Sequence, residues 1–380
     1  MKSFFLKFIF LFSILLLGGC KQNSANSVVS KSSTKNEIQH AKGIEIYHYQ
    51  GYSILKITRP WPDAKTPFTY ILQEKNGSIP DSLQQYTRIS VPIQSIVVTS
   101  TTHIPALELL GVENTLIGFP NTDFISSAKT RKRIDAGQVK EVGTNETLNT
   151  EILIDMAPEV IVSFGLNNSN PTLDNLQKSG LKVLLNGDWN EQSPLGKAEW
   201  IKFFGALYGL DAKAKAIFSN IEKEYQTTLA LAQKAKQKPT VLSGAMYQDQ
   251  WFVPQGESWM ALFLKEAQSN YLWANTTGTG SLTLPFETIL EKAQKAEFWI
   301  APGDFTSLKE MNNSNPHYAK FDAFKNKKVY SYALHKGAKG GIVFFEWSSA
   351  RPDWVLKDFI AIFHPELAPH YTPHFFEKLN

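Results

Sequence analysis

The chain has 380 residues, of which 43% are hydrophobic and 12% aromatic, so it can bury sizeable cores in about two or three domains and is not a disordered polymer. Its 39 Lys and Arg residues against 35 Asp and Glu residues give a net charge of +4, and the basic residues are dispersed, which does not indicate a nucleic-acid surface. A single cysteine excludes intrachain disulfides and a cysteine-based metal cluster.

The first 20 residues predict an export signal. A lysine-containing start and an apolar run lead to Leu17, and two glycines then precede Cys20. The run is shorter than the ~20 residues that span a bilayer, although a short transmembrane anchor ending in cysteine is the alternative. A cysteine after Leu-Gly-Gly resembles the bacterial lipobox, which implies a signal peptide at residues 1–19 and lipidation of Cys20. Residues 20–42 are rich in Ser, Asn and Lys and predict a flexible tether.

Residues 43–87 predict a small β-rich extension. The stretch "IEIYHYQGYSILKITRPW" alternates apolar and polar residues on either side of a Gln-Gly turn, which favours a β-hairpin. The stretch "FTYILQEKNGSIP" predicts a further strand. We therefore expect a β-rich segment ahead of the main body of the protein.

From residue 88 onward, short apolar runs alternate with helical patterns. "SIVVTS", "EVIVSFG" and "LKVLLNG" are typical of strands, and helical stretches separate them. Strands that are apolar throughout predict a parallel sheet covered by helices, here an N-terminal α/β lobe at residues 88–194. A long linking helix is expected at residues 195–238, with Gly209 as a candidate break between two helical pieces. The alternation then restarts and predicts a C-terminal α/β lobe at residues 239–380.

A glutamate opens a short amphipathic helix at two places in the sequence. "LNTEILIDMAPEVIVSF" at residues 148–164 places Glu151 ahead of an apolar strand, and "LPFETILEKAQKAEFWI" at residues 284–300 places Glu287 in the same position. The helix dipole alone favours a glutamate in the first turn of a helix. Its return at the matching place in each lobe indicates a shared role for the two carboxylates.

The order of these motifs resembles one known family. The lipobox, "VVTSTTHIPALELLGV", "VGTNETLNTEILIDMAPEVIVS", the long linking helix and "FETILEKAQKAEFWI" are together similar to the iron-siderophore and cobalamin group of ABC-transporter substrate-binding proteins. The resemblance covers residues 88–365, and the extension at residues 43–87 departs from the smallest family members. It implies an α/β fold with two Rossmann-like α/β lobes joined by a long helical spine, the class III architecture, and a small N-terminal β-rich extension.

The resemblance also implies a function. The protein is expected to be a lipid-anchored, periplasm-facing monomer without enzymatic activity or intrinsic cofactor, which passes its ligand to an ABC permease dimer in the inner membrane. The expected ligand is an iron chelate such as a ferric siderophore, with cobalamin or another corrinoid as the alternative and haem as a third candidate. In this family a surface glutamate on each lobe pairs with permease arginines. That implies permease docking by Glu151 and Glu287, with Glu291 as the alternative in the second lobe.

Candidate ligand-binding residues follow from the usual position of sites in α/β folds, beyond the carboxyl ends of the strands. Two facing lobes would place those loops around a shared cleft, where aromatic side chains suit a large conjugated ligand. The candidates are Thr101, Thr102, His103, Gly165, Asn167, Trp189, Tyr247, Trp251, Asp304 and His335. The aromatic candidates could equally be packing residues, and His103 could instead cap the following helix. The sequence does not place Arg131, Arg133 or Arg351 in the cleft, which leaves the charge of the ligand open.

Other functions have weaker support. The sequence contains no Gly-x-Ser-x-Gly elbow, no GxxxxGK[ST] phosphate loop and no strand-linked GxGxxG, which argues against the common α/β enzymes. The eight histidines are scattered and form neither HxH nor HExxH, so no catalytic metal site and no site for a bare zinc or manganese ion is expected. A purely structural surface lipoprotein is disfavoured by the duplicated α/β pattern, whereas a role in ligand-induced signalling stays open.

Overall fold

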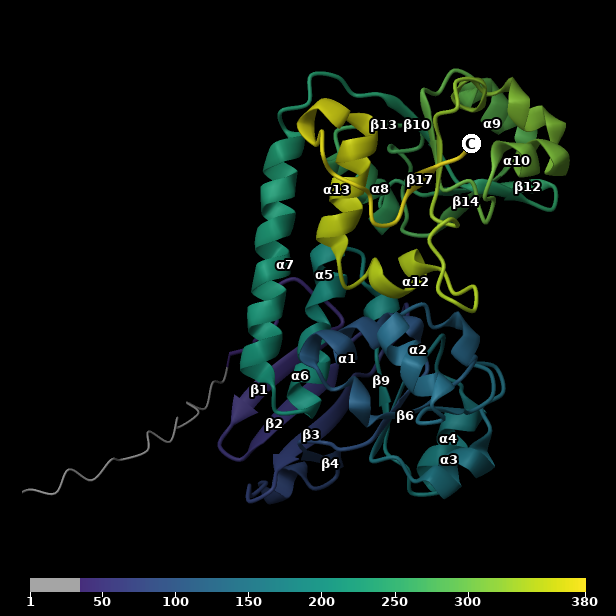
Figure 1. Cartoon of the computed structure of the whole chain (residues 1–380). Helices are drawn as coiled ribbons and strands as arrows, with labels where there is room; N and C mark the ends of the chain where they lie inside the picture. The colour runs from purple at the N-terminus through teal and green to yellow at the C-terminus, as the bar shows by residue number, and fades with distance from the viewer. Residues whose placement is uncertain (1–34) are drawn as a thin grey trace, which may run out of the picture. The chain divides into compact units, whose positions relative to one another are not determined.

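A computed structural model of the protein describes residues 35–380 (Figure 1). The predicted signal peptide at residues 1–19, Cys20 and most of the predicted tether lie outside the described residues. Within the described part, none of the helices combines the length and the hydropathy that a membrane span requires.

The N-terminal lobe is built on a five-stranded parallel sheet. In spatial order its strands are β7 (Lys140–Glu141), β6 (Leu116–Phe119), β5 (Ile96–Val98), β8 (Val160–Ser163) and β9 (Val183–Leu185). Its helices are α1 (Ile104–Leu110), α2 (Ala128–Asp135), α3 (Thr150–Met156) and α4 (Pro171–Lys178). Ile96 and Val98 join one hydrophobic cluster and Val97 another, because successive side chains of a strand point to opposite faces. Both faces of the sheet are therefore covered, as the uninterrupted apolar runs predict.

The C-terminal lobe contains a second five-stranded sheet. In spatial order its strands are β13 (Asn270–Tyr271), β10 (Thr240–Ser243), β15 (Phe298–Ile300), β16 (Val329–Ser331) and β17 (Glu377–Lys378), with β17 antiparallel to its neighbour. A smaller antiparallel sheet consists of β11 (Ala245–Tyr247), β12 (Gln250–Pro254) and β14 (Ser281–Pro285). The helices are α8 (Trp259–Glu266), α9 (Phe286–Ala293), α10 (Leu308–Ser314), α11 (Asp322–Lys325), α12 (Val343–Trp347) and α13 (Pro352–Phe363).

The two lobes repeat one topology. The strand order β6-β5-β8-β9 in the first lobe matches the order β13-β10-β15-β16 in the second, and these strands are parallel in both. β5 pairs with β8 in the first lobe, and β10 pairs with β15 in the second. A short helix precedes the second strand of each pair: α3 precedes β8, and α9 precedes β15. The α/β fold with two Rossmann-like lobes is thus confirmed, and the repeated glutamate-led helices occupy equivalent places in it.

The spine between the lobes is interrupted at Gly209, the position where the sequence indicates a break in the linking helix. It consists of α5 (Pro194–Glu199), α6 (Ile201–Leu207) and α7 (Asp211–Ala232). Gly209 has a φ of +62°, which an L residue rarely adopts, and it separates α6 from α7. α7 packs against α6 and also against α13 of the C-terminal lobe, so one helix of the spine contacts both lobes (Figure 1).

The N-terminal extension forms a four-stranded sheet. Its strands are β1 (Ile44–Tyr49), β2 (Tyr52–Ile57), β3 (Phe68–Glu74) and β4 (Thr87–Val91) in that order. β1 and β2 make the expected hairpin, and the turn between them contains Gly51 at a φ of +83°. Buried side chains of this sheet, such as Ile46 and Leu55, belong to the same hydrophobic cluster as β5 and α6. The extension therefore shares the core of the N-terminal lobe.

The flexible tether predicted for residues 20–42 extends too far toward the C-terminus. The buried carboxylate of Glu199 accepts hydrogen bonds from the backbone N–H groups of Gln39, His40 and Ala41, at donor–acceptor distances of 2.9, 2.6 and 2.9 Å. Lys202 Nζ lies 2.7 Å from the same carboxylate. Residues 39–41 are thus anchored to the spine, because a buried carboxylate needs donors that this segment supplies.

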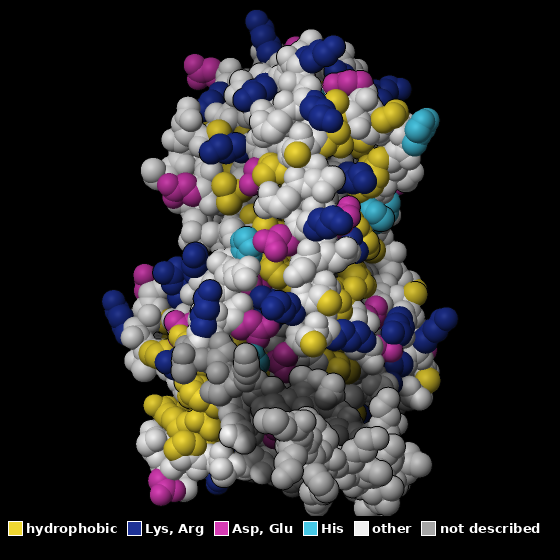
Figure 2. Space-filling view, turned by 90° about the vertical axis from the view of Figure 1, so that its left-hand side faces the viewer, with side chains coloured by type: hydrophobic (Ala, Val, Ile, Leu, Met, Phe, Trp, Pro, Cys, Tyr) yellow, Lys and Arg dark blue, Asp and Glu magenta, His cyan; other side chains and the backbone are white. Residues whose placement is uncertain are grey.

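The basic side chains are dispersed on the surface, as they are along the sequence. On the face that carries α7, Lys and Arg side chains are spread among acidic and neutral ones and do not gather into one patch (Figure 2). This face therefore lacks the continuous basic stripe that a nucleic-acid surface would show.

Candidate ligand-binding cleft

A cavity of about 490 Å³ lies where the carboxyl ends of the parallel strands of both lobes meet. Its volume is in the usual range for small-molecule sites. The N-terminal lobe contributes Thr99, Ser100, Thr101, Phe119, Pro120, Phe124, Asn145 and Phe164, and the C-terminal lobe contributes Asp304, Lys336, Gly340, Gly341, Ile342 and Phe345. We refer to this cavity as the cleft. Its position is the one that the parallel-sheet topology predicts.

Aromatic side chains dominate the lining of the cleft. Phe119 ends β6 and Phe164 follows β8, whereas Phe124 and Phe345 lie on opposite lobes. Phe124 is 59% exposed and Phe345 is 50% exposed, which is unusual for such large apolar side chains. A site with facing exposed phenyl rings favours a ligand with a large apolar or conjugated surface.

The polar lining of the cleft carries little net charge. Its hydroxyl and amide groups come from Thr99, Ser100, Thr101 and Asn145, and its charged residues are Asp304 and Lys336. No His, Tyr, Cys, Met or Arg is among the described residues that line it. The cleft therefore lacks side chains suited to bind a bare transition metal, and its opposite charges balance.

The five arginines lie elsewhere. Arg131 binds Asp135 and the carbonyl of Thr122, and Arg133 binds the carbonyl of Leu116. Arg351 pairs with Asp353 and stacks on Trp354, with its guanidinium carbon 3.7 Å from the ring centroid. Arg59 lines a separate hollow beside the extension, and Arg88 lies on β4.

Two of the residues expected to bind the ligand line the cleft. Thr101 begins a short 3₁₀ helix directly after β5, and Asp304 follows β15. His335 is adjacent in sequence to Lys336 of the cleft, but its Nε2 lies 3.6 Å from Glu377. Tyr247 is 69% exposed on β11, outside the lining. These positions leave Thr101 and Asp304 as ligand candidates.

His103 and Trp251 are too deeply buried to reach a ligand in the cleft, which corrects the sequence prediction. His103 is fully buried, lies 5.5 Å from the ring of Phe204 and has no hydrogen-bond partner on either ring nitrogen. Burial lowers the pKa of His103, so the ring is neutral. Trp251 is fully buried against Trp299 at a ring separation of 5.1 Å. Both residues help to build the cores of their lobes.

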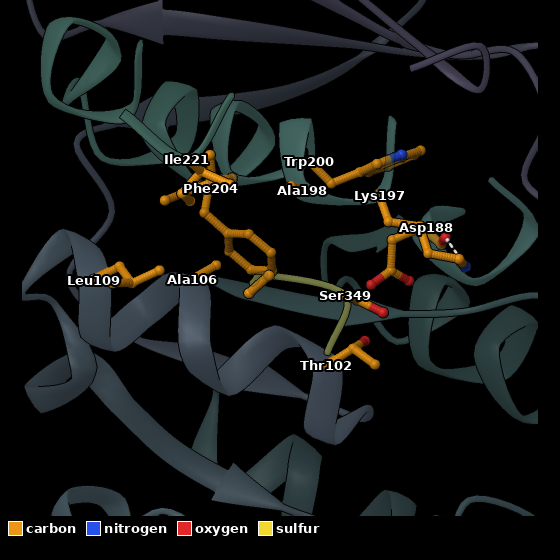
Figure 3. A pocket seen from close by; sticks show the side chains of 12 residues that line it. Thr102, Ala106, Leu109, Asp188, Lys197, Ala198, Trp200, Phe204, Ile221 and Ser349 are labelled. Carbon is orange, nitrogen blue, oxygen red and sulfur yellow. Dashed lines mark hydrogen bonds between the residues drawn. The ribbon is translucent and has the colours of Figure 1, made fainter. Parts of the chain in front are cut away.

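Thr102 and Trp189 also lie outside the cleft. Thr102 borders a cavity of about 20 Å³, the size of a single water, together with Asp188 and Lys197 (Figure 3). The Nζ atom of Lys197 donates to the carbonyls of Asp188 and Trp189 at 3.0 Å each, and burial lowers the pKa of this lysine. These bonds hold the turn after β9 against the spine.

Gly165 and Asn167 line a different hollow, of about 60 Å³, beside Trp61 and Phe68 of the extension. An added Cβ at Gly165 would lie 2.8 Å from the Trp61 ring. The extension, whose packing the sequence does not reveal, therefore covers this loop and keeps it out of the cleft.

Most of the aromatic lining is absent from the residues expected to bind the ligand. Phe119 and Phe164 come directly at the ends of apolar strands, so the rule that selected Thr101 also applies to them. Lys336 lies in the same loop after β16 as the expected His335. Phe345 gives no such signal, because the helix that carries it turns toward the N-terminal lobe only in the folded protein.

Comparison with known proteins gives the family. The model of the family described as periplasmic binding protein matches residues 96–333, which is more than half of the chain. The chain belongs to the periplasmic binding protein family. This membership agrees with the expected binding function in place of an enzymatic one.

Several known proteins are similar to this periplasmic binding protein in sequence or in fold. An uncharacterised lipoprotein of Methanocaldococcus jannaschii is 24% identical over 382 residues, covering 94% of this chain and 89% of the relative. A periplasmic haem-binding protein of Pseudomonas aeruginosa has a TM-score of 0.57 at 18% identity and covers 76% of this chain and 98% of its own. A Staphylococcus epidermidis protein, described as a possible iron-binding, periplasmic solute-binding protein, has a TM-score of 0.54 at 17% identity and covers 72% and 99%.

The lobes of this periplasmic binding protein contact each other directly beside the cleft. Glu346 of α12 accepts hydrogen bonds from the backbone N–H groups of Ser126 and Ser127 in the N-terminal lobe, at 2.6 and 3.0 Å. The carboxylate is fully buried, and burial raises the pKa of Glu346 to about 7 although the two N–H groups act in the opposite direction. A charge-sensitive contact therefore joins the lobes.

The two glutamates predicted to dock the permease are exposed. Glu151 is the second residue of α3, and Glu287 is the second residue of α9. Asn149 caps α3 through Ile152, so Glu151 is not needed as the cap. Figure 1 shows α3 and α9 on the same side of their lobes. The two carboxylates are thus available to a partner that contacts both lobes.

Proposed function

We propose that this periplasmic binding protein captures a bulky metal complex of low net charge in the cleft and delivers it to the permease of an ABC importer. The observation that carries the proposal is the lining of the cleft, which comes from strand ends of both lobes and contains four phenylalanines but no arginine. An iron chelate such as a ferric siderophore is the first candidate, a corrinoid is the alternative, and haem is the third.

The residue types that line the cleft support this ranking of the three candidate ligands. A complex whose metal is already fully coordinated needs no protein ligand, and the cleft offers no His, Tyr, Cys or Met among its described lining residues. Haem bound through an axial protein ligand fits this lining less well. A highly anionic chelate would need more cations than Lys336 alone, because buried charges must be paired. One structural neighbour is described as a possible iron-binding protein and another as a haem-binding protein, which supports the same general class of ligand.

Anchoring and docking belong to the same proposal. Cys20 carries the lipid that holds the protein at the periplasmic face of the membrane, in line with the lipoprotein relative. Glu151 and Glu287 pair with cations on two permease subunits, one from each lobe. Two exposed carboxylates at equivalent positions suit docking across a two-fold partner, since complementary charges set the orientation and the rate of encounter.

A fluorescence titration tests the ligand class. Tryptophan emission of the full-length protein is followed while ferric siderophores of neutral and of high negative charge, cyanocobalamin and haemin are added, with correction for inner-filter absorption. We expect saturable quenching, with a Kd of micromolar or tighter, by a fully coordinated complex of low charge. Tight binding of only the most anionic chelates would contradict the charge argument, and no binding by any of them would contradict the ligand class.

Two cleft variants locate the site. Phe124→Ala and Phe345→Ala should each weaken binding about tenfold, because burying a phenyl ring against the ligand contributes roughly 1.5–3 kcal/mol. Tyr247→Ala is the matched control, since Tyr247 is an equally exposed aromatic residue outside the cleft. The same titration gives the three affinities. Equal losses in all three variants, or none in the phenylalanine variants, would place the ligand elsewhere.

A further inference from the structure

A histidine and two carboxylates from three separate segments meet at the start of α7. Glu37 precedes β1, His48 lies on β1 and Asp211 is the first residue of α7. One ligand atom from each residue lies within 4.8 Å of the other two, and none of the three residues lines the cleft. We propose that Glu37, His48 and Asp211 form a binding site for one divalent transition-metal ion of the zinc type.

Ser53 orients the imidazole toward the carboxylates. Its hydroxyl oxygen lies 2.9 Å from His48 Nδ1, so a neutral ring with its proton on Nδ1 donates that proton to Ser53. The lone pair of Nε2 then faces the carboxylates, and Nε2 lies 2.5 Å from Glu37 Oε2. Histidines that bind metals are held in the same way, by a hydrogen bond from the other ring nitrogen.

The donor set selects the class of ion. One imidazole nitrogen and two carboxylate oxygens suit Zn²⁺, which binds such atoms at about 2.0–2.2 Å and accepts water as a fourth ligand. Ligand atoms around a tetrahedral ion at these bond lengths are roughly 3.3 Å apart, so the present arrangement needs only modest side-chain rotations. Ca²⁺ and Mg²⁺ prefer more oxygen ligands and no imidazole.

The surroundings of the three side chains leave room for an ion to enter. The side chain of His48 is 22% exposed and that of Glu37 is 17% exposed, so the site is shielded but connected to solvent. Lys202 and Lys215 act on Glu37, and Glu74 acts on Asp211, so two lysines face three carboxylates, including Glu74. This remaining negative charge favours a divalent cation even beside the positive end of α7.

The three side chains influence one another before any ion binds. The hydrogen bond to Glu37 raises the pKa of His48, although burial opposes the shift. Burial acts to raise the pKa of Glu37, but the hydrogen bond and the charge of His48 outweigh it and lower that pKa. Burial raises the pKa of Asp211.

The ion would connect the segment around Glu37, near the end of the predicted tether, to α7 of the spine. Glu37 lies two residues before the segment that Glu199 anchors, and Asp211 opens the helix that contacts both lobes. A metal bridge between them closes a long loop of the chain and stabilises the attachment of the extension. This role is structural and independent of ligand capture in the cleft.

Zinc titration of the full-length protein in detergent tests the site. The protein is dialysed against EDTA and then titrated with Zn²⁺ alone by calorimetry. We expect one ion per chain with a Kd of micromolar or tighter, and a higher Tm. Co²⁺ in place of Zn²⁺ should give the visible absorption of a four- or five-coordinate ion. Binding of no ion, or binding without a rise in Tm, would overturn the proposal.

Variants assign the ligands. His48→Gln and Asp211→Asn should weaken Zn²⁺ binding by at least about tenfold, since even changes to residues that only orient a metal ligand cost that much. His40→Gln is the matched control, because His40 Nε2 also lies 2.7 Å from a carboxylate, that of Glu222, but without a third donor. If His48→Gln does not fold, Ser53→Ala serves as the test and should weaken binding about tenfold. Equal binding by these variants and the wild type, or an equal loss in His40→Gln, would refute the assignment.

Discussion

The Glu346 carboxylate lies between the two lobes without exposure to solvent, and the charge of a second carboxylate, that of Glu108, acts on it. Ser127 Oγ and Thr130 Oγ1 donate to Glu108 at 2.5 Å each, so hydroxyl groups stabilise that second charge. Ionisation of Glu346 therefore acts on a contact that holds the lobes together. A change of pH therefore alters the contact of Glu346 with Ser126 and Ser127 between the lobes and leaves the hydrophobic cores of the lobes intact.

Glu346→Gln tests this link. Burial raises the pKa of Glu346 from 4.5 to about 7, so its contribution to stability is fully present below about pH 4.5 and is lost as the pH rises through about 7. Ser126 and Ser127 donate to different oxygens of the carboxylate, so the glutamine keeps an acceptor for one of the two N–H groups and does not titrate. Relative to the variant, the wild type should lose about 2 kcal/mol of unfolding free energy between pH 5 and pH 8, at 1.36 kcal/mol per pKa unit.

Urea unfolding at a series of pH values measures the difference. Asp358, whose pKa burial raises to about 6, is present in both proteins, so its effect cancels. Glu346→Ala, which leaves two buried N–H groups without an acceptor, should be less stable than Glu346→Gln at every pH. Parallel pH profiles for the wild type and Glu346→Gln would show that this carboxylate does not control the lobe contact.

The proposed permease docking depends on two elements, α3 and α9. Each is a short helix before the second parallel strand of its sheet, and each opens with an exposed glutamate at its second position. Sequence periodicity predicts both helices because their apolar positions, such as Leu153 and Ile289, recur at helical spacing and are buried. The repeat in the sequence thus corresponds to a repeat in the fold.

Loss of both glutamates should impair docking and leave ligand binding unchanged. Glu151→Ala combined with Glu287→Ala should weaken association with the permease at least about tenfold at low salt, since complementary exposed charges govern the encounter rate and salt screens them. Asp155→Ala combined with Glu291→Ala is the control, because these carboxylates are exposed on the same two helices. Binding to permease in lipid nanodiscs, together with the fluorescence titration, separates the two effects. If the control pair weakens docking as much as the test pair, the charge of the helices matters rather than these two positions.

At the scale of the whole described chain, the lobes approach each other closely through a glycine-rich loop between β16 and α12. An added Cβ at Gly337 would lie 2.5 Å from Ser126 Cα, which is closer than atoms can pack. The neighbouring residues Gly340, Gly341 and Ile342 line the cleft. The spacing of the lobes, and hence the width of the cleft, therefore depends on the absence of a side chain at residue 337.

Gly337→Ala should move this loop away from the N-terminal lobe. We expect a loss of about 1–3 kcal/mol in unfolding free energy, as for other overpacked sites, and weaker ligand binding without any change in the cleft lining itself. Gly280→Ala is the control, since the nearest atom to its added Cβ is a side-chain oxygen of Gln255 at 3.4 Å. Urea unfolding and the ligand titration measure both effects. Unchanged stability and affinity in Gly337→Ala would mean that the lobes are not held at this distance.

The candidate site was only partly predictable at the level of individual residues. Thr101 and Asp304 lie in the loops that follow buried strands, so strand prediction and the rule for parallel sheets place them in the cleft. His103 comes just two residues after Thr101, but the turn between them directs its ring into the core. The cluster of Glu37, His48 and Asp211 has no local signature, because its members are separated by up to 174 positions and meet only through folding.

The sequence by itself determined the α/β class, the two lobes, the repeated glutamate-led helices and the family, because apolar periodicity and strand–helix order are local properties of the chain. Only the tertiary structure decided which side chains face the cleft, where the arginines lie, how the extension joins the first core and where the tether ends. These features depend on contacts between residues far apart in sequence. Such contacts are set by the packing of whole elements, and no short pattern encodes them.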